Sequence, residues 1–403
     1  MDRISGFGPE DLGSIPSGLN LRDEKMNERT KKYVVGSSTL IGMCIGAGVL
    51  GIPYVASRAG FLVSVFYLLF IGGMVLLLNL YLGETALRTK RNHQLTGYAR
   101  KYLGKKAGKA MNFAILFGGY AAIVAYLVGV GDSISFLVFG NLNYSLLFGV
   151  AFGIFMSVLL WHGTRSLKRY EKYGVLAILF LLSLIFFIFI GKVDYGNLGY
   201  INLSSVLVPF GVILFAFSSE SAIPIVSLII KEEKTLMKKI IFTSSIVSIF
   251  FYLLFTFVVF GAMGSQTPEI ATFALGSVFV ILGIFTMFTS HLSLGNALEE
   301  NFQFDDRFKK SKSWFFVCVA PVLIYVVVSF FQYFSFIKIL SIGGVFSGGA
   351  IGILSLFLIK SAKLRTERKP EYSIPINWVI ISIVAIVFIA GVFQEVSSII
   401  KGI

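Results

Sequence analysis

The stretch IGAGVLGIP, residues 45–53, decides the fold, because it places three glycines and a proline inside a long apolar segment. Proline removes a backbone hydrogen bond and glycine tolerates non-helical angles, so we expect a helix to open here. A second stretch, FSSESAIP at residues 217–224, combines small polar residues, one acid and another proline. Open backbone at membrane depth is tolerated only where it lines a cavity or is buried in protein. The two stretches predict unwound segments near 46–50 and 218–222.

The composition around these stretches excludes several classes of protein. Of 403 residues, 56% are hydrophobic and only 14% are charged, whereas a soluble domain carries about 25% charged residues. Intrinsic disorder needs a low apolar content, and an outer-membrane barrel would show short alternating segments. The three histidines and two cysteines show no metal-ligand spacing, and no nucleophile–base set indicates an enzyme. We therefore expect an all-α polytopic membrane protein that is not an enzyme and has no cofactor.

A membrane-spanning helix needs about 20 consecutive apolar residues, and the chain contains eleven such segments. The expected spans are 34–57, 61–86, 111–138, 145–161, 173–191, 203–229, 240–263, 271–295, 314–334, 336–359 and 376–398.

The basic residues predict how these spans are oriented. The net charge is +14, and the basic residues sit in clusters between apolar runs, which indicates membrane topology and no nucleic-acid partner. All Lys and Arg residues lie in the N-terminal tail or the loops after even-numbered spans, except Arg58, Lys192, Lys338 and Lys401. Positive charge collects on the cytoplasmic side. The N-terminus is therefore expected in the cytoplasm and the C-terminus outside.

The two interrupted segments occupy corresponding places in the span order. The first opens a block of five helices and the second opens another block of five, which starts from the opposite side of the membrane. Paired interrupted helices in an inverted repeat indicate the binding site of a secondary transporter. The alternative is two ordinary kinks that serve helix packing. The expected parts are a cytoplasmic tail (1–33), two five-helix repeats (34–191 and 203–360), and a cytoplasmic loop with an eleventh helix (361–403).

The first stretch also resembles a family motif. Residues 46–60, GAGVLGIPYVASRAG, are similar to the first-helix signature of the amino acid/auxin permease family, within the amino acid–polyamine–organocation superfamily, and Gly131-Asp132 is similar to that family too. The resemblance implies a LeuT-type fold of 5+5 inverted helices that transports amino acids, here with one extra helix. The second stretch departs from the pattern, since Ser218 stands where many superfamily members have glycine.

A broken helix offers unpaired N–H groups to an anion and unpaired carbonyl groups to a cation, so such a site matches the two charges of an amino acid. Glycines at 46 and 48 would let a ligand reach the backbone. The N–H groups of Ala47, Gly48 and Val49 are expected to face the substrate carboxylate. The remaining candidate substrate-binding residues supply carbonyls or pocket walls, although the aromatic ones could equally serve packing: Cys44, Gly46, Tyr120, Tyr126, Phe215, Phe217, Ser218 and Ser221.

Three titratable residues are candidates for coupling or gating. Glu220 is the one acid expected near the centre of a span, where a carboxylate is costly and usually functional. His291 titrates near neutral pH and could carry a coupling proton. Asp132 is a weaker candidate, because it could simply reach the outer interface. For Glu220 and His291 the alternative is a hydrogen bond that serves only the structure.

Span 8 carries hydroxyl oxygens of the kind that ligate Na⁺. Thr286 and Ser290 share one helix face, and Thr289 adjoins it. In LeuT-type transporters a sodium site joins this helix to two carbonyls of the first span, which would here be those of Gly42 and Ile45. The alternative is that the hydroxyls bond carbonyls of their own helix.

The expected function is cation-coupled symport of a neutral L-amino acid by alternating access, with Na⁺ favoured over H⁺. The alternatives are proton-coupled symport and a non-transporting amino acid sensor of the same fold. A channel is not favoured, because no filter motif is present. The expected partners are the amino acid, the coupling cation and membrane lipid. We expect a monomer in the plasma membrane.

Overall fold

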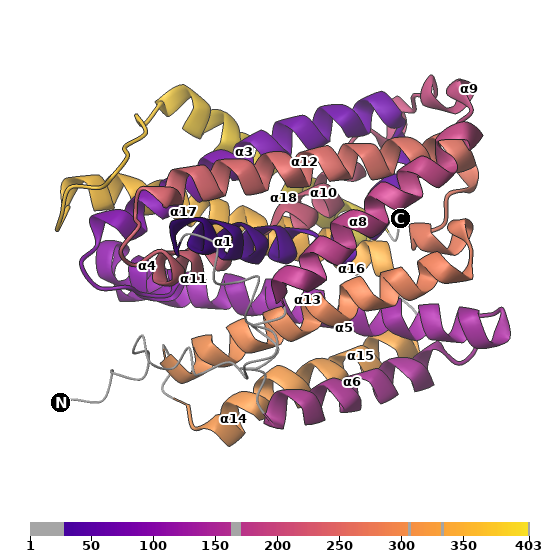
Figure 1. The fold of residues 1–403 in the computed structure, drawn as a ribbon, viewed down its shortest axis with the longest axis horizontal. Helices are drawn as coiled ribbons and strands as arrows, with labels where there is room; N and C mark the ends of the chain where they lie inside the picture. The colour runs from indigo at the N-terminus through magenta and orange to yellow at the C-terminus, as the bar shows by residue number, and fades with distance from the viewer. Residues whose placement is uncertain (1–27, 163–170, 305–307, 332–333, 402–403) are drawn as a thin grey trace.

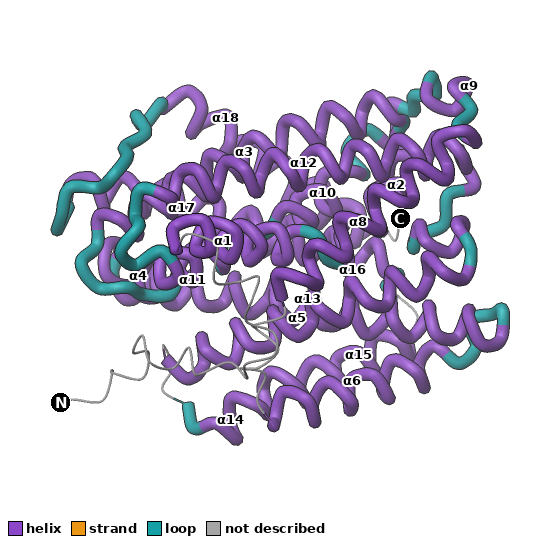
Figure 2. The backbone as a smooth tube through the Cα atoms, in the orientation of Figure 1, coloured by secondary structure: helices purple, strands orange, loops and turns teal. Residues whose placement is uncertain are grey.

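The computed structural model describes residues 28–162, 171–304, 308–331 and 334–401. These residues form helices joined by loops, and no strand is drawn among them in Figure 2. Within the described part, nine helices are long and apolar enough to cross a membrane, and a bent helix pair makes a tenth candidate span. The long helices lie roughly parallel in Figure 1, as expected for a polytopic membrane protein.

The elements of the first half follow the predicted spans. They are α1 (Glu28–Cys44) with α2 (Ala47–Ala59), α3 (Phe61–Arg88), α5 (Lys105–Phe139), α6 (Ser145–His162) and α8 (Glu171–Phe189). A short helix, α4 (Leu95–Leu103), joins α3 to α5 at one end of the bundle, and α9 (Tyr195–Leu198) follows α8 at the other end. Because α1 begins at Glu28, residues 28–33 of the predicted tail are helical; residues 1–27 lie outside the described part.

The second half repeats the order of broken and continuous spans. It begins with α10 (Pro209–Phe217) and α11 (Ala222–Ile229), followed by α12 (Leu236–Met263) and α13 (Ser277–Phe304). Next, α14 (Lys310–Trp314) continues through the π-helix η7 (Phe315–Val319) into α15 (Ala320–Phe331). In the same way, α16 (Phe336–Gly343) continues through the π-helix η8 (Gly344–Gly348) into α17 (Gly349–Leu364). A further helix, α18 (Trp378–Lys401), follows where the eleventh span was predicted.

Both predicted breaks are present, and the first lies earlier than expected. Helices α1 and α2 meet at a bend of 47°, and only Ile45 and Gly46 lie between them. Residues 47–50, predicted to be unwound, form the first turn of α2, and Pro53 lies inside this helix although it has no N–H to donate to the Val49 carbonyl. The second break covers residues 218–221, in agreement with the prediction except that Ala222 already begins α11.

Glycines bring the two broken helices close together. A Cβ atom at Gly48 would lie 2.6 Å from the Cα atom of Ala216, so α2 and α10 are in backbone contact. A Cβ atom at Gly344 would clash with the carbonyl oxygen of Gly211, so η8 also reaches the backbone of α10. Small residues allow this close packing between membrane helices. The broken helices therefore form the centre of the bundle.

Apolar side chains cover the outside of the bundle. On α6 and α15 the residues that face outward are large and apolar, and they include Leu147, Phe155, Leu323, Val327 and Phe330. Such surfaces are rare on soluble monomers and are typical of a lipid-facing surface. The helices α6 and α15 lie side by side along one edge of the bundle in Figure 1.

Candidate functional site

A cavity of about 90 Å³ lies where the two breaks meet. It extends toward the end of the bundle that carries α4, because Gln94 and Leu95 also line it. Ligand cavities for small molecules usually measure about 300–1,000 Å³, so this cavity is small for a ligand site. The residues from the two breaks that line it are Cys44, Gly46, Ala47, Gly48, Phe215, Ser218, Glu220 and Ser221.

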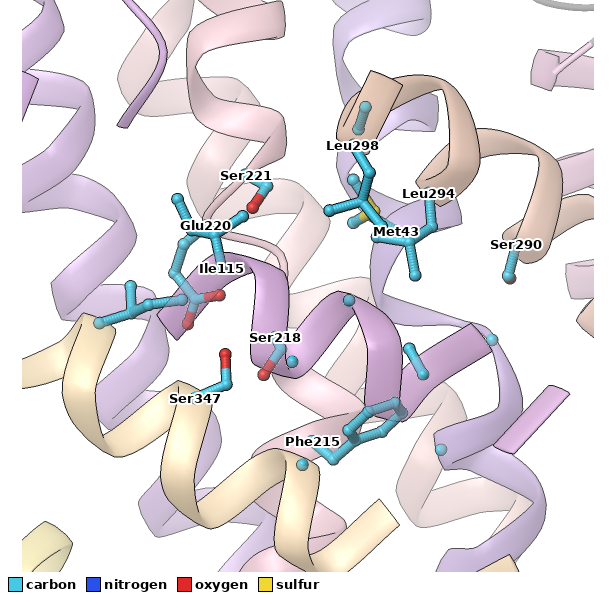
Figure 3. Close-up of a pocket in the computed structure, with 18 of the residues that line it drawn as sticks. Met43, Ile115, Phe215, Ser218, Glu220, Ser221, Ser290, Leu294, Leu298 and Ser347 are labelled. Atoms are coloured by element: carbon cyan, nitrogen blue, oxygen red, sulfur yellow. The ribbon is translucent and has the colours of Figure 1, made fainter. Parts of the chain in front are cut away.

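The cavity has a polar and an apolar part. In Figure 3 the oxygen atoms of Ser218, Glu220 and Ser347 point toward the same part of the cavity. Apolar side chains lie across from them, and Figure 3 labels Leu294 and Leu298 of α13 there. A ligand with one polar end and one apolar end would match this division.

The amino end of α2 forms one wall. Gly46 is the N-cap of α2 and has no side chain that could cap the helix. The first N–H groups of a helix have no partner within that helix, and here Ala47 and Gly48 both line the cavity. This arrangement suits a carboxylate. Val49, the third predicted donor, is fully buried and is not among the lining residues.

The carbonyl groups predicted to face an ammonium group already have partners. The Cys44 carbonyl accepts hydrogen bonds from the Gly46 N–H at 2.9 Å and from the Tyr252 hydroxyl at 2.6 Å. The Phe215 carbonyl accepts from the Ser218 N–H at 3.0 Å. The Phe217 carbonyl faces the Cys44 thiol, with 3.8 Å between sulfur and oxygen. An ammonium group would therefore compete with, or add to, donors of the protein.

Glu220 lies in the second break and is 4% exposed. Its carboxylate faces the cavity (Figure 3). Within the described part of the chain, no basic side chain forms an ion pair with it. The structure therefore places an acid without a cation partner beside the candidate ligand site, where it could bind a proton or an amino group.

Ser290 faces the first break from α13. A Cβ atom at Gly46 would lie 2.8 Å from the Ser290 hydroxyl oxygen and 3.2 Å from the Tyr126 hydroxyl oxygen. Both Tyr126 and Ser290 line the cavity. The neighbouring His291 does not line it; its ring packs against Phe152 at 5.5 Å and Tyr126 at 6.1 Å between ring centroids. The structure thus puts His291 directly behind the cavity wall.

Three of the five residues predicted to bind Na⁺ line cavities, and they are divided between two of them. Gly42 and Thr289 line a second, larger cavity of about 390 Å³ between α1, α8, α11 and α13, while Ser290 lines the first one. Thr286 and Ile45 are buried and line neither cavity. The Thr286 and Thr289 hydroxyls donate to carbonyls of their own helix, at 2.8 and 3.0 Å, as the alternative interpretation expected. Their oxygen lone pairs remain as acceptors.

Three other predicted residues lie away from the cavity. The Tyr120 hydroxyl donates to the Phe316 carbonyl at 2.7 Å, so it joins α5 to η7. Phe217 is buried and packs its ring on Tyr252, 5.0 Å between centroids. Asp132 lies on α5 beyond the lining residues. In the described part of the chain, no group of three or more His, Cys, Asp or Glu residues could hold a metal ion.

Two polar residues next to the breaks were not identified from the sequence. Asn79 of α3 donates to the Ser219 hydroxyl at 3.1 Å and so supports the second break. An amide inside an apolar span is a signal that could have identified it. Tyr252 of α12 contacts both breaks through its hydroxyl group. It gave no such signal, because it is one of several aromatic residues in its span.

Comparisons with known proteins agree with this architecture. A model of the tryptophan/tyrosine permease family matches residues 29–396. Glutamine transporter 2 of Aliivibrio fischeri is 25% identical over 311 residues, which are 72% of this chain and 79% of that protein. Tyrosine-specific transport system 1 of Haemophilus influenzae is 26% identical over 41% of each chain. Amino acid transporter AVT1H of Arabidopsis thaliana is 25% identical over 46% of this chain and 45% of that one.

A solved structure supports the fold. The structure of Mhp1, a nucleobase-cation-symport-1 family transporter in a closed conformation with bromovinylhydantoin bound, superposes with a TM-score of 0.59 over 92% of each chain. Sequence identity is 12%, so the likeness concerns the fold alone. It agrees with the LeuT-type arrangement that the sequence motif implied.

Proposed function

Because the chain belongs to the tryptophan/tyrosine permease family, we propose that it is a secondary active transporter of an amino acid with an aromatic or amide side chain. The family differs from the amino acid/auxin permease family that the first-helix motif suggested, while the amino acid transporter class and the LeuT-type fold agree. The observation that carries the proposal is the cavity at the two breaks, with the amino end of α2 on one side and Glu220 on another.

The cavity suits the common part of all amino acids. The amino end of α2 would bind the carboxylate. The amino group would lie toward the carbonyl ends of α1 and α10 and toward Glu220. The apolar part beside Leu294 and Leu298 would receive the side chain. Because the cavity measures only about 90 Å³, an aromatic side chain requires a more open conformation, as alternating access provides.

We propose that transport is coupled to a cation and that Na⁺ binds between α1 and α13. The candidate ligands are the carbonyls of Gly42 and Ile45 and the hydroxyls of Thr286, Thr289 and Ser290. Helices α1 and α13 pack against each other. The alternative is proton coupling, for which Glu220 and His291 are the candidate groups, with Asp132 a third group nearer the end that carries α9.

The remaining proposals concern topology. The end of the bundle that carries α4 would face the cytoplasm, and α18 would bring the C-terminus to the outside of the cell membrane. The two five-helix blocks, 34–191 and 203–360, would form the inverted repeat, and the protein would work as a monomer.

Uptake into proteoliposomes tests the proposed function. We expect accumulation of radiolabelled L-tyrosine, L-tryptophan or L-glutamine when an inward cation gradient is imposed, and no accumulation in liposomes without protein. Binding of an amino acid without any uptake or exchange would instead indicate the sensor. Absence of both binding and uptake for a panel of all standard amino acids would contradict the proposal.

A further inference from the structure

The hydroxyl group of Tyr252 lies between the carbonyl ends of the two broken helices. Its oxygen is 2.6 Å from the carbonyl oxygen of Cys44 and 2.7 Å from that of Ala216. Cys44 is the last residue of α1, and Ala216 is next to last in α10. Carbonyls in the last turn of a helix have no partner within it. One side chain of α12 therefore serves acceptors of both breaks.

The Tyr252 hydroxyl group cannot donate a hydrogen bond to both carbonyl groups at once. A tyrosine hydroxyl has a single hydrogen, so it can donate to only one of the two carbonyls at a time. The Cys44 carbonyl also accepts the Gly46 N–H. When Tyr252 donates to Cys44, that carbonyl has both lone pairs occupied. When Tyr252 donates to Ala216, the Cys44 carbonyl has one lone pair free. Cys44 lines the cavity, and Tyr252 does not.

The hydroxyl group offsets the repulsion between the carbonyl ends of the two broken helices. Each carbonyl end of a helix carries roughly half a negative elementary charge, so the ends of α1 and α10 repel each other at this distance. The shared hydroxyl draws both carbonyls to one point. The ring itself is fully buried and packs against Phe217 at 5.0 Å between centroids. The position of the hydroxyl is therefore fixed by packing on α12.

We propose that Tyr252 is a positioning residue for the amino group of the substrate. It holds the Cys44 carbonyl at the cavity and, when the amino group arrives, donates its hydrogen to Ala216 instead. The amino group then supplies the donor that the two carbonyls and the hydroxyl lack, and all three oxygens are satisfied. The inference rests on the proposed function, because it assigns a role in amino acid binding.

The test compares an amino acid with its analogue that lacks the amino group. Binding of L-tyrosine and of 3-(4-hydroxyphenyl)propionate is measured by calorimetry on purified wild-type protein and on Tyr252→Phe. L-Glutamine and 4-carbamoylbutanoate form the second pair. We expect Tyr252→Phe to weaken binding of the amino acid at least tenfold and binding of the analogue less than twofold. The ratio of amino acid affinity to analogue affinity should therefore be smaller in Tyr252→Phe than in the wild type.

Tyr325→Phe is the matched control. Tyr325 is equally buried and its hydroxyl donates one hydrogen bond, to the Ser145 carbonyl at 2.9 Å, away from the breaks. We expect this variant to leave the discrimination unchanged. If Tyr252→Phe weakens both ligands equally, or leaves the discrimination as in the wild type, the inference is wrong. Failure of the wild type to bind any amino acid would instead overturn the proposed function.

A second substitution serves if Tyr252→Phe does not fold. Incorporation of 3-fluorotyrosine at position 252 keeps the hydroxyl group and makes it a stronger donor. We expect 3-fluorotyrosine in place of Tyr252 to increase the ratio of amino acid affinity to analogue affinity. The same replacement of Tyr325 should leave this ratio unchanged. Equal effects at the two positions would overturn the assignment.

Discussion

Gly46 and Gly48 lie two residues apart in the first break, yet they face different neighbours. A Cβ atom at Gly48 would lie 2.6 Å from the backbone of Ala216, while one at Gly46 would lie 2.8 Å from the side-chain oxygen of Ser290. Backbone cannot move without moving its helix, whereas a serine side chain can adjust. Glycine at 48 is therefore required for the packing of α2 on α10, and glycine at 46 shapes the cavity.

We accordingly expect Gly48→Leu to abolish folding, because the leucine side chain would meet the backbone of Ala216. Gly46→Ala should fold and bind the amino acid more weakly, because the methyl group enters the cavity beside Ser290. The measurements are the yield of monodisperse protein in detergent, its thermal unfolding and its affinity for the amino acid. Gly73→Ala is the control for a glycine in a membrane helix, since nothing lies within 4 Å of its Cβ position.

Combining Gly46→Ala with Ser290→Ala tests the contact directly. Removing the Ser290 hydroxyl gives the new methyl group room, so the double variant should regain part of the lost affinity. Additive losses in the two single variants would contradict the contact, because residues that touch show interaction energies in such a cycle. Well-folded Gly48→Leu protein would contradict the packing argument.

At the scale of single residues, the sequence indicated the residues of the two breaks better than the side chains that other helices direct toward them. Gly46, Ser218 and Glu220 could be predicted, because glycine, small polar residues and an acid are conspicuous in apolar spans. Tyr120 was predicted as pocket wall but bonds the Phe316 carbonyl, and Tyr252 was overlooked. A tyrosine beside the breaks and a tyrosine away from them look alike in the sequence, because only the packing of the helices decides where each hydroxyl group points.

Among the connecting elements, the segment between α17 and α18 is attached to the end of α3. Glu84 of α3 is fully buried and forms ion pairs with Arg88 at 2.7 Å and Lys363 at 3.3 Å. The same carboxylate accepts hydrogen bonds from the Ser373 hydroxyl at 2.9 Å and the Ile374 N–H at 2.8 Å. One acid therefore connects α3, α17 and the segment that leads to α18.

We expect Glu84→Gln to destabilise the protein by about 2–4 kcal/mol, because Arg88 and Lys363 lose their counter-charge while keeping partial access to solvent. Unfolding by SDS from mixed micelles measures the change. Glu367→Gln is the matched control. A hydrogen bond from Lys101 lowers the pKa of Glu367, so its carboxylate is charged as well, but this exposed pair should contribute less than about 1 kcal/mol.

Equal stability of the two variants would show that the Glu84 contacts do not hold this segment in place. Loss of the attachment should also make residues 365–377 more accessible to protease in Glu84→Gln than in Glu367→Gln. Tyr372 belongs to the same attachment, since its hydroxyl donates to the Leu80 carbonyl at 2.7 Å.

At the scale of elements, the sequence predicted the spans well and their details less well. Apolar length is sufficient to locate a membrane helix: ten of the eleven predicted spans correspond to candidate membrane spans among the described residues, and α18 lies where the eleventh was predicted. The start of α2 at Ala47 could not be predicted, because glycines and proline indicate that a helix is interrupted somewhere nearby without fixing the residue. Glu84 was missed because it lies at the end of an expected span, where a charge is unremarkable in sequence.

In the whole molecule, α1 lines both cavities. The smaller cavity lies between its carbonyl end, α2 and α10, and the larger one lies between α1, α8, α11 and α13. Met43 lines both. A ligand in either cavity therefore contacts the last turns of α1. If α1 takes up different positions during alternating access, ligands in the two cavities act on the same moving element and their binding is linked.

This linkage gives the last prediction. If Na⁺ binds beside Gly42 and Thr289, it and the amino acid should each raise the affinity for the other by the same factor, typically by about 1–3 kcal/mol. Thr289→Ala combined with Ser290→Ala should then remove the Na⁺ dependence of uptake and leave a low, Na⁺-independent rate. Calorimetric titration of the amino acid in NaCl and in choline chloride measures the linkage, and uptake with each salt measures the coupling.

Proton coupling leads to the opposite pattern. Uptake would proceed fully in sodium-free buffer under an inward pH gradient, and Glu220→Gln or His291→Ala would leave exchange of amino acid intact while abolishing accumulation against a gradient. The geometry makes Glu220 the stronger of the two, because its carboxylate lies in the cavity whereas His291 lies behind Tyr126. Full sodium-free uptake that persists in the Thr289 and Ser290 double variant would end the sodium proposal and transfer the coupling role to Glu220.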